Sequence, residues 1–253
     1  MSAKEELRGI AFWADALSEE EAAHALKGIA HRHFRVGEYI CHCGDGLDYW
    51  TGVLDGLVKV GAISESGKPM AFTGVGRGGW FGEGAILKNE ARKYDLVALR
   101  DTRLAMMNRA PFMELFETSI RFTQFLVRHL NERVAQFVVA IECDRMHDPT
   151  VRVARNLAWL FNPVLYPHAD NHIEITQEEL ALLVGASRQM TNKALLQLEA
   201  AGLLVSERAG VRIVDPWRSP DTKADRSCRL RWRQYGDTQS FCIRDVQFGR
   251  YGS

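Results

Sequence analysis

An apolar seam with helical spacing constrains the fold of this chain more than any other sequence feature. Between positions 113 and 141, apolar residues recur at alternating spacings of three and four, and Thr123 is the one polar member of the row. Such a heptad pattern over about 30 residues predicts a long helix, which Pro111 opens because its fixed φ suits a first turn. The members are Met113, Phe116, Ile120, Thr123, Val127, Leu130, Val134, Phe137 and Ile141.

A second apolar row lies beside the seam, formed by Phe122, Phe125 and Leu126. A helix with two such rows can bury one face on its own domain and the other on a partner helix. We therefore expect a homodimer built on residues 111–147, and a single long core helix is the alternative.

Residues 33–107 show a different sequence pattern, in which short apolar stretches are separated by Gly-rich turns. Many short strands with frequent turns are typical of an antiparallel β-barrel or β-roll. Before them, Ser18 and Glu21 have the spacing of a capping box, which predicts a short helix from about Glu19 to Ile29.

The overall composition excludes several classes of protein. Lys and Arg total 32, as do Asp and Glu, so nucleic acid or an anionic membrane would have to be met by a local patch. Apolar runs are too short for a membrane span, and the amphipathic N-terminus lacks a signal peptide's apolar core, so we expect a cytoplasmic protein without a membrane partner. Five cysteines without framework spacing indicate reduced thiols.

A compact segment near the C-terminus has the capping and turn residues of a helix-turn-helix. Thr176 and Glu179 form a second capping box, Gly185 permits a tight turn, and Ser187 caps a second helix that ends near Gly202. The following stretches "LLVSE" and "VRIVD" are predicted to pair as a two-stranded wing, with Arg208 at its tip in reach of a DNA phosphate.

The second helix of this segment has two different faces. Thr191, Ala194, Leu195 and Leu198 share one face, and the other presents Arg188, Gln189, Asn192 and Lys193. Arg can donate two hydrogen bonds to guanine, Gln can pair with adenine, and Lys can reach guanine or phosphate. We therefore expect this face to enter a DNA major groove, the alternative being a helical hairpin with a solvated polar face.

The charge of this segment opposes a purely electrostatic mode of DNA binding. Residues 171–215 contain four basic residues (188, 193, 208 and 212) and six acidic ones (174, 178, 179, 199, 207 and 215). Affinity is therefore expected from a few placed contacts, from dimerisation and from the positive ends of the two helices.

Taken in order, these elements resemble the Crp/Fnr superfamily of bacterial transcription regulators over roughly residues 15–215. The most specific pieces are "HDPTVRVARNLAWL" and "ITQEELALLVGASRQMTNKALLQLEAAGLL", which are similar to the family's hinge helix and DNA-reading motif. The resemblance implies an α+β chain: a cyclic-nucleotide-binding-type β-roll with an N-terminal helix (1–110), a long dimerisation helix (111–147) and a winged helix-turn-helix (148–215). A basic extension of unknown role follows (216–253).

The resemblance also implies a function. Family members are homodimers that bind an imperfect palindrome in double-stranded DNA, and a small effector in the β-roll adjusts their two reading helices. RNA polymerase is an expected further partner if the protein activates transcription. By position, Arg188, Gln189 and Lys193 fall where the family contacts bases, and Thr176 matches its phosphate-contacting Thr. Cyclic-AMP receptors carry Glu where this chain has Gln189, so a different preferred half-site is expected.

The stretch "FGEGAILKNEAR" aligns with the family's phosphate-binding cassette. There, a Gly-Glu pair cradles a sugar-phosphate and an Arg-Ser pair holds the phosphate, which implies Gly82, Glu83 and Arg92 as effector contacts. Such residues suit an anion, because Gly allows close backbone approach and Arg offers a bidentate fork.

This chain departs from the cassette at positions that matter for the ligand. Lys93 replaces the family's Ser, and Phe137 and Val138 stand where a Thr and a Ser recognise adenine. Cyclic AMP is therefore not the expected effector, and Arg92 with Lys93 favours a more highly charged anion or phosphorylated ligand, such as a dinucleotide. The alternatives are a structural Glu83–Arg92 ion pair in an empty roll, and an effector-independent or redox-responsive regulator.

Two other features attract attention without matching a motif. In Cys41-His42-Cys43 a strand would place both thiols on one face, but no further ligand stands at metal-site spacing, so we expect free thiols and no metal or certain cofactor. The tail contains "RLRWR", which mixes Arg with an aromatic as nucleic-acid contacts often do, yet it lacks periodicity. We expect a loosely packed extension, the alternatives being an extra DNA contact or subunit packing. No nucleophile or base accompanies Glu83 and Arg92 at motif spacing, so an enzyme is not expected.

Overall fold

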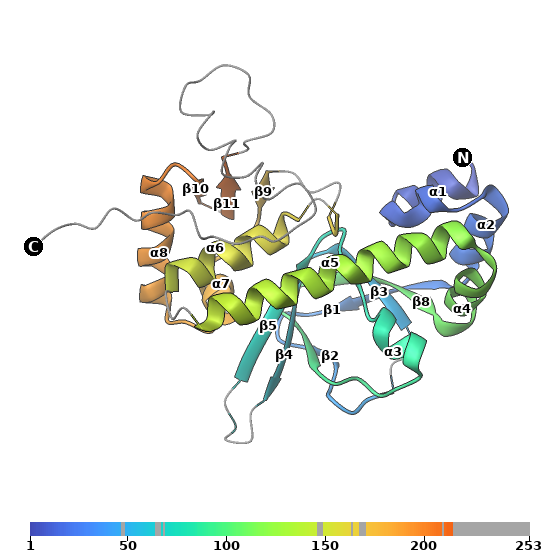
Figure 1. Ribbon diagram of the computed structural model, residues 1–253, viewed down its shortest axis with the longest axis horizontal. Coiled ribbons are helices and arrows are strands. Elements are labelled where there is room, and N and C mark those ends of the chain that lie inside the picture. Colours follow the sequence, from blue (N-terminus) through green and yellow to red (C-terminus); the bar gives the residue numbers. More distant parts are fainter. Residues whose placement is uncertain are drawn as a thin grey trace, which may run out of the picture.

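The computed structural model arranges the chain around one long helix, with a β-roll beside it and a helical domain toward its C-terminal end (Figure 1). The structure describes residues 1–46, 49–63, 67, 69–145, 149–162, 164–166, 171–208 and 210–214. The expected extension over 216–253 and the hinge at Asp148 lie outside the described residues.

Three short helices precede the roll: α1 (Ala3–Arg8), the 3-10 helix η1 (Phe12–Ala16) and α2 (Glu19–Lys27). The capping box at α2 is confirmed, since Ser18 Oγ accepts from Glu21 N at 3.2 Å and Glu21 Oε2 accepts from Ser18 N at 2.7 Å. Trp13 of η1 is buried against Trp50 and Trp80, so these helices close one end of the roll.

The roll consists of two four-stranded antiparallel sheets, which confirms the expected architecture. One sheet has the order β1-β8-β3-β6 and the other β2-β7-β4-β5. Val53, Val58 and Leu104 are buried in the core of the roll. The strands are β1 (Ile29–Phe34), β2 (Tyr39–Cys41), β3 (Tyr49–Asp55), β4 (Leu57–Ile63), β5 (Pro69–Gly76), β6 (Trp80–Phe81), β7 (Asp95–Ala98) and β8 (Thr102–Asn108), with α3 (Glu83–Lys88) between β6 and β7.

The single helix expected over 111–147 is wrong in one respect, because the chain forms two helices there. These are α4 (Arg109–Thr118) and α5 (Ile120–Arg145), separated at Ser119, whose backbone is extended. Ser119 starts α5 afresh, because its carbonyl accepts from Thr123 N at 3.0 Å and its Oγ from Phe122 N at 3.4 Å. Because the heptad row of apolar residues continues across Ser119, the sequence pattern does not reveal this break between the two helices.

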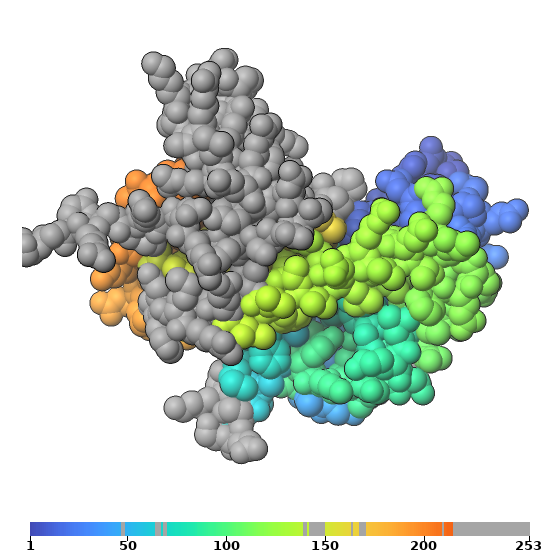
Figure 2. All heavy atoms as spheres, viewed as in Figure 1, coloured from blue at the N-terminus to red at the C-terminus, as the bar shows by residue number. Residues whose placement is uncertain are grey.

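Helix α5 has a buried row and an exposed apolar row, as its two sequence patterns predicted. Phe122 and Leu126 are buried in the core of the roll's helical end. Figure 2 shows α5 lying open along one face of the molecule. Its exposed apolar side chains include Ile120 (75% exposed), Val127 (59%), Val134 (60%) and Ile141 (58%), which recur every seven residues. This row has no covering element within the described chain.

The C-terminal domain has the predicted winged helix-turn-helix order. It contains α6 (Pro149–Leu160), β9 (His172–Ile173), α7 (Gln177–Val184), α8 (Arg188–Ala200), β10 (Leu204–Glu207) and β11 (Gly210–Ile213). Leu180, Leu183, Leu195 and Leu198 are buried in its core, as predicted for the apolar faces of its helices. None of the helices in the described ranges is long and apolar enough to cross a membrane.

Candidate DNA-binding surface and effector cassette

Helix α8 separates its apolar and polar residues as the sequence predicted. Thr191, Ala194, Leu195 and Leu198 are buried against the domain. The opposite face is exposed and carries Arg188, Gln189, Asn192 and Lys193. Asn192 Oδ1 accepts from Gln177 Nε2 at 3.0 Å, which ties α8 to the start of α7. The face therefore offers two cations and two amides, the side chains that read base edges in the major groove.

The two helices of the motif begin with the predicted caps. Thr176 Oγ1 accepts from Glu179 N at 3.1 Å, and Glu179 Oε2 accepts from Thr176 N at 2.6 Å. Ser187 Oγ accepts from Met190 N at 3.2 Å. Gly185 ends α7 with φ of 64°, a left-handed conformation that glycine adopts without strain. The turn is therefore fixed locally, and α8 leaves it in one direction.

Three of the expected DNA contacts converge although they come from three different elements. Thr176 at the start of α7, Arg188 at the start of α8 and Arg208 after β10 line one cavity of about 430 Å³. Arg208 is exposed at the tip of the wing. In the wing itself, Arg212 pairs with Glu207 at 2.6 Å. The cations that this surface directs outward are therefore Arg188, Lys193 and Arg208.

The predicted cassette is centred on Gly82, which precedes α3 with φ of 100°. Arg92 is 2% exposed, and a Cβ built on Gly82 would lie 2.5 Å from Arg92 Nη2. Arg92 donates to the Tyr49 carbonyl at 2.8 Å and to Tyr94 Oη at 3.2 Å. Only a glycine leaves room for this guanidinium, so the Gly-Glu step and Arg92 form one unit.

The expected alternative of a Glu83–Arg92 ion pair is wrong, because Glu83 has a different partner. Arg133 Nε of α5 lies 3.3 Å from Glu83 Oε1. Arg133 also donates to the Trp80 carbonyl, and His129 Nε2 lies 3.2 Å from the same oxygen. Sequence reasoning missed His129 and Arg133. Two polar residues four apart, among the apolar rows of a helix, were the available signal.

The remaining predicted effector residues do not join the cassette in this structure. The Lys93 side chain is 73% exposed and pairs with Glu90 at 3.1 Å. Phe137 packs its ring edge-on to Trp159 of α6 at 5.9 Å between centroids, and Val138 is exposed on α5. None of these three side chains contacts Glu83 or Arg92 among the described interactions. Within one chain, the cassette is thus formed by Gly82, Glu83, Arg92 and Arg133.

Several buried polar atoms of the cassette and of β6 lack a hydrogen-bond partner. Buried atoms without a hydrogen-bond partner include Glu83 Oε2, Arg92 Nε and Trp80 Nε1. Arg133 pairs with Glu83, whereas the buried Arg92 donates to neutral oxygens of Tyr49 and Tyr94 and has no ion pair among the described contacts. Buried charges and polar atoms are costly without partners. An anion can accept from Arg92 Nε, whereas Glu83 Oε2 needs a donor, such as a ligand hydroxyl.

Burial of His129 predicts an acid-sensitive fold. Burial lowers the pKa of His129 from 6.5 to about 4, and the nearby Arg133 guanidinium adds to the shift. Between pH 6.5 and 4 the unfolded chain binds a proton at His129 that the folded chain excludes. The contribution of neutral His129 to the unfolding free energy is therefore fully present above pH 6.5 and is lost as the pH falls toward 4. We expect a loss of up to about 3 kcal/mol in unfolding free energy from this residue.

Urea titrations across this pH range measure the effect. His129→Gln should flatten the decline, and His33→Gln, which removes an exposed histidine of β1, should keep it. Equal slopes in wild type and His129→Gln would contradict the assignment.

The two thiols of Cys41-His42-Cys43 do not share one face, which corrects that expectation. Cys41 ends β2 and is buried, whereas Cys43 lies in the following turn and is exposed. Asp95 holds the turn by accepting from Cys43 N at 2.8 Å. Burial raises the pKa of the Cys41 thiol to about 11, so the reactive thiolate is disfavoured. Over the described ranges, no group of three or more His, Cys, Asp or Glu residues is placed to hold a metal ion.

Two family models match the chain, and together they span more than half of it. The cyclic nucleotide-binding domain model matches residues 31–119, which contain the roll and the cassette. The Crp-like helix-turn-helix domain model matches residues 151–218, which contain α7, α8 and the wing.

Curated relatives and a solved structure agree with these matches. Transcriptional regulator SdrP of Thermus thermophilus is 28% identical, with 72% of this chain and 88% of the relative covered. The cAMP-activated global transcriptional regulator Vfr of Pseudomonas aeruginosa is 27% identical, with 72% and 89% covered. The structure of the c-di-GMP responsive global regulator CLP of Xanthomonas campestris shares the fold, with a TM-score of 0.51, 22% identity, and coverage of 78% of this chain and 100% of that one.

Proposed function

Because the chain belongs to the Crp/Fnr superfamily of transcription regulators, we propose that it binds an imperfectly palindromic DNA site as a homodimer and responds to an anionic effector in its roll. The observation that carries DNA binding is the intact polar face of α8, exposed on a helix whose cap, turn and apolar face are all in place. The relatives are transcriptional regulators, and the same role is proposed here.

The proposed division of labour follows the chain. Residues 1–110 sense the effector, α5 within 111–147 dimerises, and residues 148–215 bind DNA; a basic extension over 216–253 follows. Arg188, Gln189, Asn192 and Lys193 contact base edges. Thr176, Ser187 and Arg208 contact or approach phosphates, because the helix starts and the wing tip direct positive charge outward.

Dimerisation is supported by the exposed heptad row of α5. Val127, Val134 and Ile141 form an apolar strip that water covers in the single chain, and a second copy of α5 would bury it. A two-fold dimer carries two α8 helices, which read two half-sites about one helical turn apart. If the protein activates transcription, RNA polymerase is the further partner.

An anionic effector is supported by the charge of the cassette. Arg92 is buried beside Gly82 with its Nε unpartnered, and Glu83, which pairs with Arg133, has a second oxygen free to accept from a ligand hydroxyl. Phe137 and Val138 offer adenine no hydrogen bond, so we propose a phosphorylated ligand other than cyclic AMP. The structural relative that is named as c-di-GMP responsive makes a cyclic dinucleotide a reasonable first probe.

Thermal shift measurements test the effector proposal. Cyclic di-GMP, cyclic AMP and inorganic phosphate are added to wild type, Arg92→Ala and Lys88→Ala, each variant being compared with its own ligand-free Tm. We expect a phosphorylated probe to raise the Tm of wild type and Lys88→Ala by a few degrees, and Arg92→Ala to lose the shift. Lys88 is the control, since it is an exposed cation of α3.

The opposite outcome favours the second candidate, a regulator that needs no effector. The specific observation on its side is that Arg92 and Arg133 already fill the space beside Gly82 and Glu83. If none of the probes shifts the Tm of wild type, or if Arg92→Ala keeps the shift, the anion proposal fails and this second candidate stands.

A further inference from the structure

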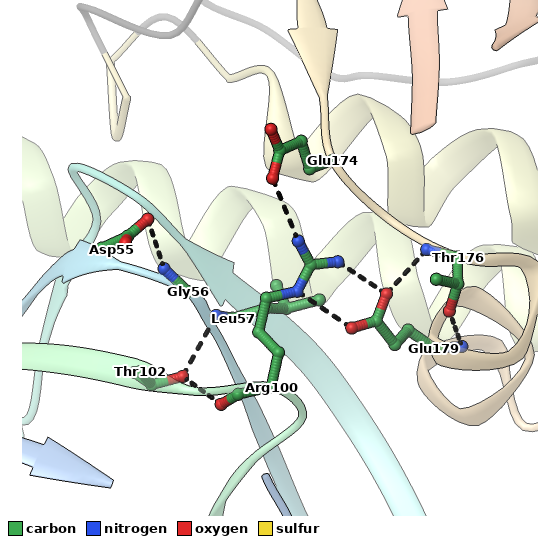
Figure 3. A network of polar contacts seen from close by, with 8 residues as sticks. All are labelled: Asp55, Gly56, Leu57, Arg100, Thr102, Glu174, Thr176 and Glu179. Atoms are coloured by element: carbon green, nitrogen blue, oxygen red, sulfur yellow. Dashed lines mark hydrogen bonds and ion pairs between the residues drawn. The ribbon is translucent and has the colours of Figure 1, made fainter. Parts of the chain in front are cut away.

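Arg100 of the sensor domain reaches into the DNA-binding domain (Figure 3). It lies between β7 and β8, and its guanidinium forms a bidentate pair with Glu179 of α7, with Nε 2.9 Å from Oε1 and Nη2 2.6 Å from Oε2. Its third nitrogen, Nη1, lies 3.6 Å from Oε2 of Glu174. One sensor cation therefore serves two carboxylates at the start of α7.

The loop that carries Arg100 is held in place by its own domain. The Arg100 carbonyl accepts from Thr102 Oγ1 at 2.8 Å, and Thr102 Oγ1 accepts from Leu57 N at 3.3 Å. Gly56 has φ of +100°, and a Cβ there would lie 2.4 Å from Thr102 Oγ1. The Arg100 backbone is thus held by the roll, so the guanidinium moves with the roll.

Glu179 connects Arg100 directly to the cap of α7. Its Oε2 atom, which binds Arg100, also accepts from Thr176 N at 2.6 Å. Burial alone would raise the pKa of Glu179, but the bonds from Arg100 and Thr176 keep it below its ordinary value. The carboxylate is therefore ionised near the residue at which a DNA phosphate is proposed to bind.

The contact between the domains leaves the DNA-facing side open. Leu57 of β4 belongs to the same apolar core as Leu180 and Leu183, and Gly74 of β5 runs against Leu183. Thr176 and Arg188, by contrast, are exposed. The described part of the sensor therefore packs on α7 away from Thr176 and Arg188, and leaves these two residues exposed.

The start of α7 has an unfavourable charge for DNA. Glu174, Glu178 and Glu179 surround Thr176, and residues 171–215 contain more acidic than basic residues. Carboxylates beside a helix start repel a phosphate that the helix dipole would otherwise attract. A cation is needed at this place, and among the described residues of the C-terminal segment none pairs with Glu179.

We propose that Arg100 is a positioning residue for DNA binding: the sensor domain supplies the cation that neutralises Glu179 and Glu174, which lets a DNA phosphate approach Thr176. The inference rests on the DNA binding proposed above. On this proposal the roll contributes one residue to the DNA-binding surface. A movement of the roll away from α7 would leave the Glu179 and Glu174 carboxylates unpaired, and these would repel the DNA phosphate.

Three variants test this role by DNA affinity, measured by fluorescence anisotropy on the selected site and on random duplex. Arg100→Ala should bind both DNAs about fivefold to tenfold more weakly than wild type. Arg103→Ala is the matched control, since it removes an exposed cation of the neighbouring strand β8 and should bind like wild type. Glu179→Gln should bind at least as tightly as wild type, because Gln preserves the capping box without the charge.

The double variant separates neutralisation from a merely structural tie. Adding Glu179→Gln to Arg100→Ala should restore wild-type affinity, although the ion pair is absent from both. Failure of this rescue, or tighter binding by Arg100→Ala, would overturn the inference. If wild type binds and Arg100→Ala is unchanged, the inference alone fails; a wild type without DNA affinity would refute the proposed function as well.

Discussion

Val134→Asp is expected to convert the protein from a dimer to a monomer and to weaken binding to a two-fold DNA site by more than about 100-fold. Val134 is 60% exposed and lies midway along the exposed row of Val127 and Ile141. A dimer would bury it, and a carboxylate at that place would lose its hydration without gaining a partner. The loss of affinity follows because each monomer then holds one half-site alone.

Analytical ultracentrifugation gives the oligomeric state, and anisotropy gives the affinity. Val36→Asp is the matched control, because Val36 is 66% exposed but lies outside α5. It should remain dimeric and bind normally. A dimeric Val134→Asp with unchanged affinity would show that another surface joins the subunits.

Arg188→Ala is expected to remove the preference for the selected site while leaving weak binding to random DNA. Arg188 is exposed at the first position of α8, where a bidentate bond to guanine is worth about 1–3 kcal/mol in each half-site. Two half-sites together make the loss roughly 30-fold or more for the dimer. Competition between the selected site and random duplex measures it.

Arg208→Ala provides the contrast within the same domain. Arg208 is exposed at the wing tip, where a phosphate contact carries no base preference. This variant should bind both DNAs more weakly and reduce the salt slope by about two, one for each subunit of the dimer. If Arg188→Ala behaves in the same way and retains full discrimination, Arg188 does not contact bases.

Local signals explain what could be predicted from the sequence. The capping boxes at Ser18 and Thr176, the turn at Gly185 and the two faces of α8 depend on residues within one or two helical turns. These interactions form wherever their short segments form, so spacing alone identifies them. The order of the elements then indicated the family and the fold.

Contacts between distant segments explain what could not be predicted. Arg133 pairs with Glu83 across 50 positions, and no local spacing distinguishes this pair from one between Glu83 and Arg92. Arg100 and Glu179 lie 79 positions apart, and no local pattern connects them. The break at Ser119 was hidden for another reason: the heptad row specifies which face is apolar, and a short interruption of the backbone does not disturb that row.

The central claim, a dimer that reads DNA with α8, is tested most directly by selecting bound sequences from a random duplex library with the wild-type protein. The account predicts an imperfect palindrome with two half-sites about one helical turn apart. Recovered sequences without a shared motif, or a motif with one half-site alone, would contradict it.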